Sequence, residues 1–147
     1  RSLLKNQKLI LRSPNSVRPW QHVLDPLYGY LLLLMKLDKK QVVTGSSFNF
    51  GPNRYSNKTV NEVINLINKN FNNEVKIIRK KNNSKIYKES KILMLDSSKS
   101  KKILRWNTKY NLKQNINLTS SWFKLLMYKK NKNVLKFTQE QIKEFLN

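Results

Sequence analysis

The segment from Arg12 to Tyr30 reads RSPNSVRPWQHVLDPLYGY and runs from an extended stretch directly into an apolar helix. Pro19 biases the preceding Arg18 toward an extended backbone. Side chains alternate along a strand, so Trp20 and His22 are predicted to point the same way. Arginine offers a planar fork of five donors, and beside aromatic rings this fork suits a ligand that carries phosphate.

The helices predicted around this segment have recognisable start signals. Thr59 and Glu62 are spaced as a capping box. Asp96 or Ser97 is expected to cap a short helix, and Thr138 is expected to cap the last one. Together with hydrophobic periodicity, these signals predict helices over residues 24–37, from 60 onward, over 98–104, over 112–128 and from 138 onward.

Short apolar runs between these helices are predicted to be extended. They cover residues 8–12, 17–23, 42–49, 75–78 and 92–95. Strands that alternate with helices favour an α/β or an α+β architecture. We expect a single region over residues 1–147, with residues 129–137 as the candidate linker to the last helix.

The charge balance of the chain has two interpretations. It carries 30 Lys and Arg against 8 Asp and Glu, a net charge of +22, which is typical of proteins that bind nucleic acid or anionic surfaces. However, the lysines are spread along the chain among many asparagines, as expected for the coding bias of an AT-rich genome. We adopt this second interpretation, and we expect neither a nucleic-acid partner nor a membrane partner.

The scarcity of cysteine and histidine excludes several kinds of site. The chain has no cysteine and one histidine, which excludes disulfides, thiolate zinc sites and a His-rich metal cluster. The absence of cysteine fits a reducing cytoplasm. The apolar stretch over residues 27–37 is too short to cross a bilayer. Because the first residue is Arg1 rather than an initiator Met, we expect the chain to begin inside a longer protein.

A resemblance emerges from the order of several motifs. The chain resembles the C-terminal half of the CDP-glucose 4,6-dehydratases, which are extended short-chain dehydrogenase/reductase enzymes. The segments that carry the resemblance are RPWQHVLDPLYGYLLLLMKL at 18–37, FNFGP at 48–52, TVNEVINLI at 59–67, ESKILMLDSSKSKKILRW at 89–106 and TQEQIKEFLN at 138–147. RPWQHV with FNFGP is fairly specific to this branch, and the remaining segments are general to the family.

This resemblance implies a fold and a function. The chain would be the C-terminal substrate-binding portion of an extended short-chain dehydrogenase/reductase, without the complete Rossmann domain. The parent enzyme would be an NAD-dependent lyase that dehydrates CDP-glucose to the 4-keto-6-deoxy sugar, in deoxysugar or O-antigen synthesis. A homodimer of the parent is compatible with the resemblance. Its partners would be the CDP-sugar and a missing N-terminal Rossmann half, against which helix 24–37 and the strand ending in FNFGP would pack.

The family's Gly-rich cofactor turn and its catalytic Tyr-x-x-x-Lys pair are expected to lie upstream of this chain. We therefore predict no catalytic, cofactor-binding or metal-binding residue here, no NAD bound by this chain alone and no activity alone. The resemblance implies four substrate-binding candidates: Arg18, His22, Asn57 and Lys88.

Each candidate has a structural alternative. Arg18 resembles the arginine that holds the diphosphate in related dehydratases, but it could equally be a solvated or salt-bridged strand residue. His22 could bond the nucleotide or lie satisfied beneath Trp20. Asn57 could contact the nucleotide or form a turn. Lys88 departs from the family's usual His-Glu-Ala pattern, so it would meet phosphate only as a point charge.

Two further positions bear on the resemblance. Asn49 is interpreted as a structural residue at a strand end. Arg105 stands where the family usually has a glycine, so the geometry of the preceding helix end is in question. The alternative function is a standalone basic module for nucleic acid or anionic surfaces, but such a module has no need for RPWQHV followed by FNFGP.

Overall fold

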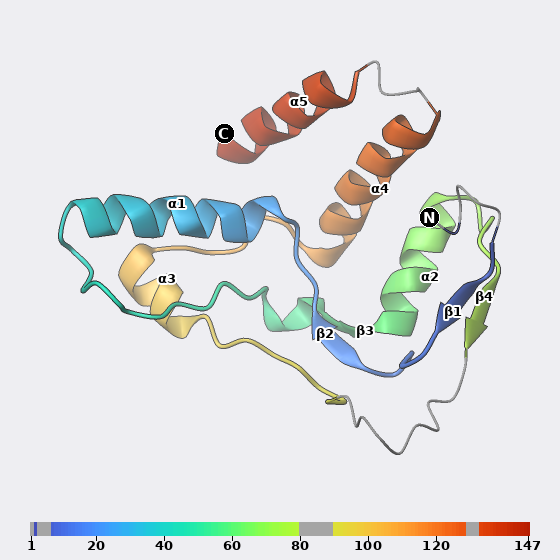
Figure 1. The fold of residues 1–147 in the computed structure, drawn as a ribbon, viewed down its shortest axis with the longest axis horizontal. Helices are drawn as coiled ribbons and strands as arrows, with labels where there is room; N and C mark the ends of the chain where they lie inside the picture. The colour runs from blue at the N-terminus through green and yellow to red at the C-terminus, as the bar shows by residue number, and fades with distance from the viewer. Residues whose placement is uncertain (1, 3–6, 80–89, 129–132) are drawn as a thin grey trace.

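The computed structural model describes residues 2, 7–79, 90–128 and 133–147. Figure 1 shows α1 as an arm on one side of the molecule and α2 on the opposite side, beside β1 and β4. The elements are β1 Leu9–Leu11, β2 Val17–Pro19, α1 Leu24–Asp38, the 3-10 turn Arg54–Ser56, β3 Asn57–Thr59, α2 Val60–Asn70, β4 Ile77–Arg79, α3 Ser98–Leu104, α4 Leu112–Tyr128 and α5 Val134–Leu146.

The strands of the described residues form two small sheets. β1 pairs with β4 in parallel, and β2 pairs with β3 antiparallel in the register Val17 with Thr59, Arg18 with Lys58 and Pro19 with Asn57. A single bridge joins Val17 to Ile92. The predicted mixed α/β class is confirmed, and the described residues contain no complete doubly wound sheet.

The start of α2 follows directly from its sequence. The Thr59 side chain accepts a hydrogen bond from the Glu62 backbone N–H, while the Glu62 carboxylate accepts one from the Thr59 N–H at 2.8 Å. This is the predicted capping box, and it satisfies two of the donors that a helix N-terminus leaves open. Helix α4 also has the predicted bounds.

A small core lies between α1, α3 and the segment that contains FNFGP. Phe50, Leu104 and Trp106 are its buried members, and Trp106 is fully buried. The rings of Phe50 and Trp106 meet edge to face at 5.2 Å. A Cβ atom at Gly29 would collide with the Phe50 ring, so the glycine allows α1 to approach this segment closely.

Three sequence predictions are wrong. Residues 42–49 form no strand, and of residues 92–95 only Ile92 makes a bridge. Both segments lack a full ladder partner among the described residues, and a strand depends on such a partner for its hydrogen bonds. Thr138 does not cap the last helix, because α5 begins four residues earlier. Its hydroxyl instead donates to the Val134 carbonyl at 2.8 Å.

Residues 134–137 of the predicted linker therefore belong to α5, and residues 129–132 lie outside the described part of the chain. The short helix α3 begins at the predicted residue. Of its two candidate caps, only Asp96 makes a capping hydrogen bond. Asp96 accepts from the Ser98 N–H at 2.9 Å, whereas the Ser97 hydroxyl bonds to the backbone of Gly51.

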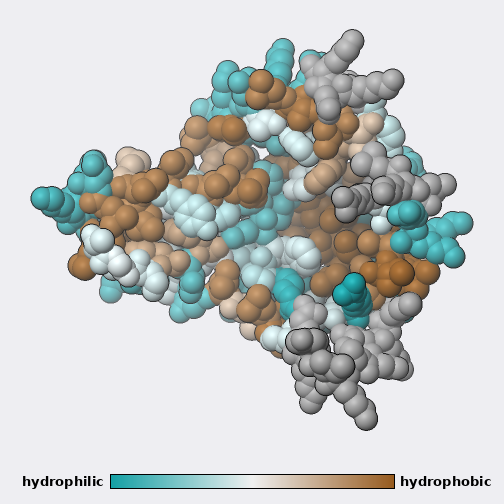
Figure 2. Space-filling view, viewed as in Figure 1, coloured by the Kyte–Doolittle hydropathy of each residue, from teal (hydrophilic) through white to brown (hydrophobic). Residues whose placement is uncertain are grey.

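One face of α1 is unpartnered among the described residues. Its apolar side chains are between 47% and 61% exposed: Leu27, Leu31, Leu34 and Met35. Figure 2 shows hydrophobic residues covering much of the arm that contains α1. Exposed apolar patches of this kind mark surfaces that bind a partner. None of the helices in the described part has the length and apolarity needed to cross a membrane.

Candidate functional site

The β2–β3 ladder places two cationic residues opposite each other. Arg18 pairs with Lys58, and directly opposed residues of an antiparallel pair project from the same face of the sheet. Like charges in this position repel each other. Lys58 is partly balanced by Glu62 at 3.7 Å, but both side chains are well exposed, and ion pairs of this kind are weak. The β2–β3 ladder therefore brings two cationic side chains together on one face.

Arg18 also has structural bonds. Its Nη1 donates to the Val17 carbonyl at 2.8 Å and to the Ser90 carbonyl at 3.0 Å. These bonds tie β2 to the segment that begins at residue 90 and fix one end of the guanidinium. The structural alternative for Arg18 thus includes a link between two backbone segments.

Asn57 lies next to Lys58 in β3, but alternation along the strand directs it to the other face. Its Oδ1 atom is buried and has no hydrogen-bond partner among the described residues. Buried polar atoms are usually paired, so an open acceptor is compatible with a bound group. Trp20 anchors the same strand, because its Nε1 donates to the Lys58 carbonyl at 2.8 Å.

His22 is 5% exposed and lies at the entry to α1. Its Nδ1 accepts from the Leu24 backbone N–H at 3.4 Å, and its ring meets Tyr110 edge to face at 5.4 Å. Burial lowers the pKa of the imidazole, since the charged form loses hydration. The aromatic neighbour in this contact is Tyr110, whereas the sequence suggested Trp20.

The buried carboxylate of Asp25 holds this region together. Its Oδ1 accepts from the Lys109 N–H at 2.7 Å, and its backbone carbonyl accepts from Trp106 Nε1 at 2.8 Å. Burial raises the pKa of Asp25, while backbone N–H groups of the loop, Lys109 first, act in the opposite direction. Asp25 thus fastens the start of α1 to the loop that follows α3.

Three residues singled out by the sequence analysis remain. Lys88 lies outside the described residues. Asn49 donates to the Asp96 carbonyl at 3.3 Å, a contact in line with a structural role. Arg105 adopts a left-handed conformation, with φ 55°, at the end of α3. The arginine itself therefore takes the conformation for which glycine is the usual residue.

The sequence analysis expected neither the Gly-rich cofactor turn nor the Tyr-x-x-x-Lys pair in this chain, and the second expectation needs a correction. The three glycines, Gly29, Gly45 and Gly51, are too far apart to form G-x-G-x-x-G. However, the spacing Tyr-x-x-x-Lys does occur, at Tyr87 with Lys91 and at Tyr128 with Lys132. Tyr87 and Lys132 lie outside the described residues, so the structure assigns neither pair a role. Within the described residues, no cluster of three His, Asp or Glu side chains could hold a metal ion.

Lys58 was missed by the sequence analysis. Its relation to Arg18 depends on the register between β2 and β3, which are separated by a whole helix and a loop. Nothing in the local sequence fixes that register. The only local signal was the capping box at Thr59, which locates the end of β3 but not its partner.

Comparison with known proteins identifies a similar curated enzyme. No family model matches the chain. The chain is 32% identical over 124 residues to CDP-glucose 4,6-dehydratase from Salmonella typhimurium, and the match covers 84% of this chain and 34% of that protein. The chain therefore spans about a third of the length of this curated relative.

Solved structures show the same fold. UDP-glucuronic acid 4-epimerase from Bacillus cereus, in complex with UDP-glucuronic acid and NAD, matches with a TM-score of 0.69 and 17% identity over 85% of this chain and 38% of its own. dTDP-glucose 4,6-dehydratase from Bacillus anthracis, in complex with NAD, matches with a TM-score of 0.65 and 23% identity over 90% of this chain and 38% of its own.

The fold thus matches part of these enzymes, as expected for a portion of an extended short-chain dehydrogenase/reductase. Among these enzymes, the chain is homologous to the nucleotide-sugar 4,6-dehydratase and epimerase family, and its curated relative is a CDP-glucose 4,6-dehydratase. The resemblance predicted from RPWQHV and FNFGP is confirmed.

Proposed function

We propose that the chain is the C-terminal, nucleotide-sugar-binding part of a CDP-glucose 4,6-dehydratase. The similarity to the Salmonella enzyme over 84% of the chain carries the proposal. The parent would be a cytoplasmic lyase of deoxysugar or O-antigen synthesis, converting CDP-glucose to the 4-keto-6-deoxy sugar with NAD. A homodimer of the parent remains compatible with the proposal.

NAD is assigned to a part of the parent outside this chain. The chain has no G-x-G-x-x-G, the turn that brings pyrophosphate to a helix N-terminus. The residues here therefore do not fit a dinucleotide site of that type. We assign to that outside part the role of covering the exposed face of α1.

The diphosphate of the sugar nucleotide is assigned to Arg18, with Lys58 beside it. Two cationic side chains on one face of the ladder provide charged donors for the oxygens of a diphosphate. A charge-assisted bond from a guanidinium contributes roughly 1.5–3 kcal/mol, and more donors give better geometry. Binding would redirect part of the guanidinium while the strand register keeps Arg18 in place.

Asn57 and Lys88 are assigned contacts with the nucleotide, the first through its buried open Oδ1 and the second as a point charge. His22 receives no contact with the diphosphate, because its imidazole is buried and kept neutral. A neutral imidazole donates one hydrogen bond without a charge, which suits an uncharged group of the ligand.

The first test of the proposal uses the purified 147-residue chain. We expect no bound nicotinamide in its absorbance and mass spectra, and no 4-keto-6-deoxy product after incubation with CDP-glucose and NAD. We also expect both phosphorus resonances of CDP-glucose to shift on titration with the chain in moderate salt. Turnover by the chain alone would contradict the proposal, and so would phosphorus resonances of CDP-glucose that do not move on titration.

A further inference from the structure

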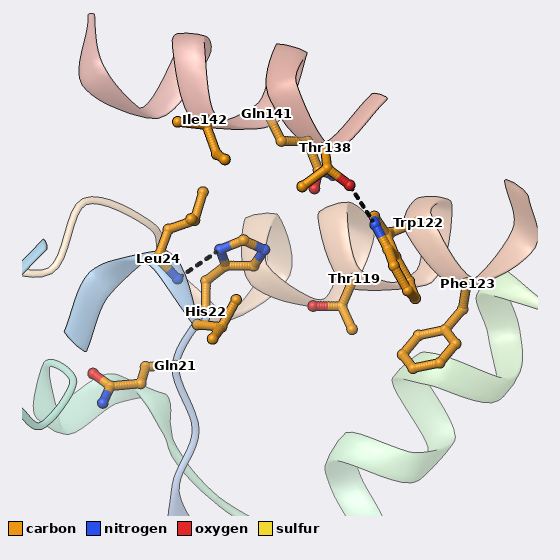
Figure 3. A pocket seen from close by; sticks show the side chains of 10 residues that line it. Gln21, His22, Leu24, Thr119, Trp122, Phe123, Thr138, Gln141 and Ile142 are labelled. Carbon is orange, nitrogen blue, oxygen red and sulfur yellow. Dashed lines mark hydrogen bonds between the residues drawn. The ribbon is translucent and has the colours of Figure 1, made fainter. Parts of the chain in front are cut away.

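A cavity of about 500 Å³ lies between the entry to α1 and helices α4 and α5. Its walls include His22, Leu24, Thr119, Trp122, Phe123 and Ile142. Figure 3 shows the His22 ring directed into the space between the two C-terminal helices. Pockets of this size accommodate small organic molecules. Neither Arg18 nor Asn57 lines the cavity, so the diphosphate assignment does not account for it.

His22 provides a hydrogen-bond donor inside this cavity. Its Nδ1 is the acceptor of the Leu24 N–H, so the neutral ring carries its proton on Nε2. Nε2 has no hydrogen bond to another described residue, although the side chain is 5% exposed. Because burial lowers the pKa of His22, the neutral form persists near pH 7. A buried ring thus presents an N–H group to the cavity.

The aromatic wall opposite is held in place. Trp122 Nε1 donates to the Thr138 hydroxyl at 2.9 Å, which joins α4 to α5 across the cavity. The Phe123 ring packs edge to face against Trp122 at 5.2 Å. The fixed indole offers a planar apolar surface, with the phenyl ring nearly perpendicular to it at 84°, and such a surface favours a ring system as the occupant.

The lining excludes a charged occupant. Apart from the neutral imidazole, the ten described residues around the cavity include no ionisable side chain, although the chain as a whole carries a net charge of +22. An ion in such a cavity would lose its hydration without gaining a counter-charge. A neutral molecule would bury its apolar surface at no such cost.

We propose that this cavity binds a small uncharged aromatic carbonyl compound. The ring system lies against the Trp122 indole, and the carbonyl oxygen accepts the hydrogen bond from His22 Nε2. This site goes beyond the proposed handling of a nucleotide sugar, because it takes a neutral ligand and involves neither Arg18 nor Lys58.

The test uses 6-propionyl-2-(dimethylamino)naphthalene, a neutral naphthyl ketone whose fluorescence rises and shifts to the blue in apolar sites. We expect saturable binding of one molecule per chain. His22→Phe keeps the ring and removes the donor, so it should weaken binding about three- to tenfold. Thr119→Trp fills the cavity and should abolish binding.

Leu34→Ser is the matched control, because Leu34 is 61% exposed on the open face of α1, where an apolar probe could adhere without a site. Its affinity for the probe should equal that of the original chain. His22 is the only histidine, so its 15N resonances in the original chain are unambiguous. They should shift at saturating probe, and this measurement does not depend on whether Thr119→Trp folds.

Three results would overturn the inference. The first is equal affinity of the original chain and His22→Phe. The second is unmoved His22 nitrogen resonances at saturating probe, and the third is loss of binding in Leu34→Ser.

Discussion

Helix α2 and the segment 42–50 are both rich in apolar residues, and both were predicted to be regular, yet only α2 forms. A helix makes its backbone hydrogen bonds within itself, and α2 also has a complete capping box. A strand takes those bonds from a neighbour, and residues 42–50 have none in regular pairing among the described residues. Segment 42–50 is instead held by side chains, chiefly Phe50 against Trp106.

The largest predicted effect comes from removing that side-chain anchor. Trp106→Ala should lower the free energy of unfolding by about 3–5 kcal/mol, because the residue is fully buried and its indole also bonds to Asp25. Urea denaturation followed by circular dichroism measures this change. Tyr55→Ala is the control, since Tyr55 is 71% exposed and should change little. A loss below about 1 kcal/mol would show that segment 42–50 has another anchor.

Asp25 should give a smaller effect that depends on pH. Asp25→Ala leaves the Lys109 N–H unsatisfied and should cost about 1–3 kcal/mol, whereas Asp25→Asn keeps an acceptor and should cost less. Denaturation of the original chain and both variants across a pH series measures these costs.

The pH dependence has a definite sign. Burial raises the pKa of Asp25 in the folded state, so the folded chain binds this proton more tightly than the unfolded chain. The stability of the original chain relative to Asp25→Asn should therefore be greatest below the unfolded pKa. It should fall as the pH rises through the folded pKa. A relative stability that increases with pH would contradict burial as the dominant cause.

The capping box should be worth about 1 kcal/mol. Thr59→Ala removes the acceptor for the Glu62 N–H, and loss of an N-cap hydroxyl costs about 0.5–2 kcal/mol. Thr44→Ala is the matched control in the segment 42–50, because Thr44 is exposed and lies outside any helix. Thermal unfolding of the two variants compares them. Equal losses would mean that α2 is stabilised by packing rather than by its cap.

The smallest effect should be stabilising. Arg105→Gly relieves a left-handed conformation that costs a non-glycine residue roughly 1 kcal/mol, so the melting temperature should rise slightly. Lys101→Gly, in the middle of α3, should lower it, because glycine is unfavourable inside a helix. If both variants lower the melting temperature, the Arg105 side chain contributes more than its backbone strain costs.

Elements with local signals were predictable from the sequence. The cap at Thr59 and the periodicity of residues 112–128 gave α2 and α4 correctly, because the information lies within a few residues. The prediction of Thr138 as a cap was wrong because α5 begins at Val134, which places Thr138 inside the helix. Its hydroxyl accepts instead from Trp122 on α4, 16 residues away in the sequence.

The candidate site was predictable only in part. Arg18 could be chosen from its sequence context, but its position opposite Lys58 depends on a register that only folding fixes. The surroundings of His22 were likewise not predictable. Its ring contacts Tyr110 rather than Trp20, because the loop after α3 packs against the start of α1. Long-range pairing of this kind leaves no mark on the local sequence.

The most direct test of the proposed function is the affinity for CDP-glucose of chains that differ at Arg18. Calorimetry in moderate salt should show binding that Arg18→Lys weakens about tenfold or more, because lysine keeps the charge and loses the fork. Arg18→Ala should cost at least as much, while Arg12→Ala, an exposed arginine nearby in the sequence, should stay within about twofold. Melting temperatures of the same samples separate binding from the link between Arg18 and Ser90. Unchanged affinity in folded Arg18→Ala, or no binding by the original chain, would contradict the account.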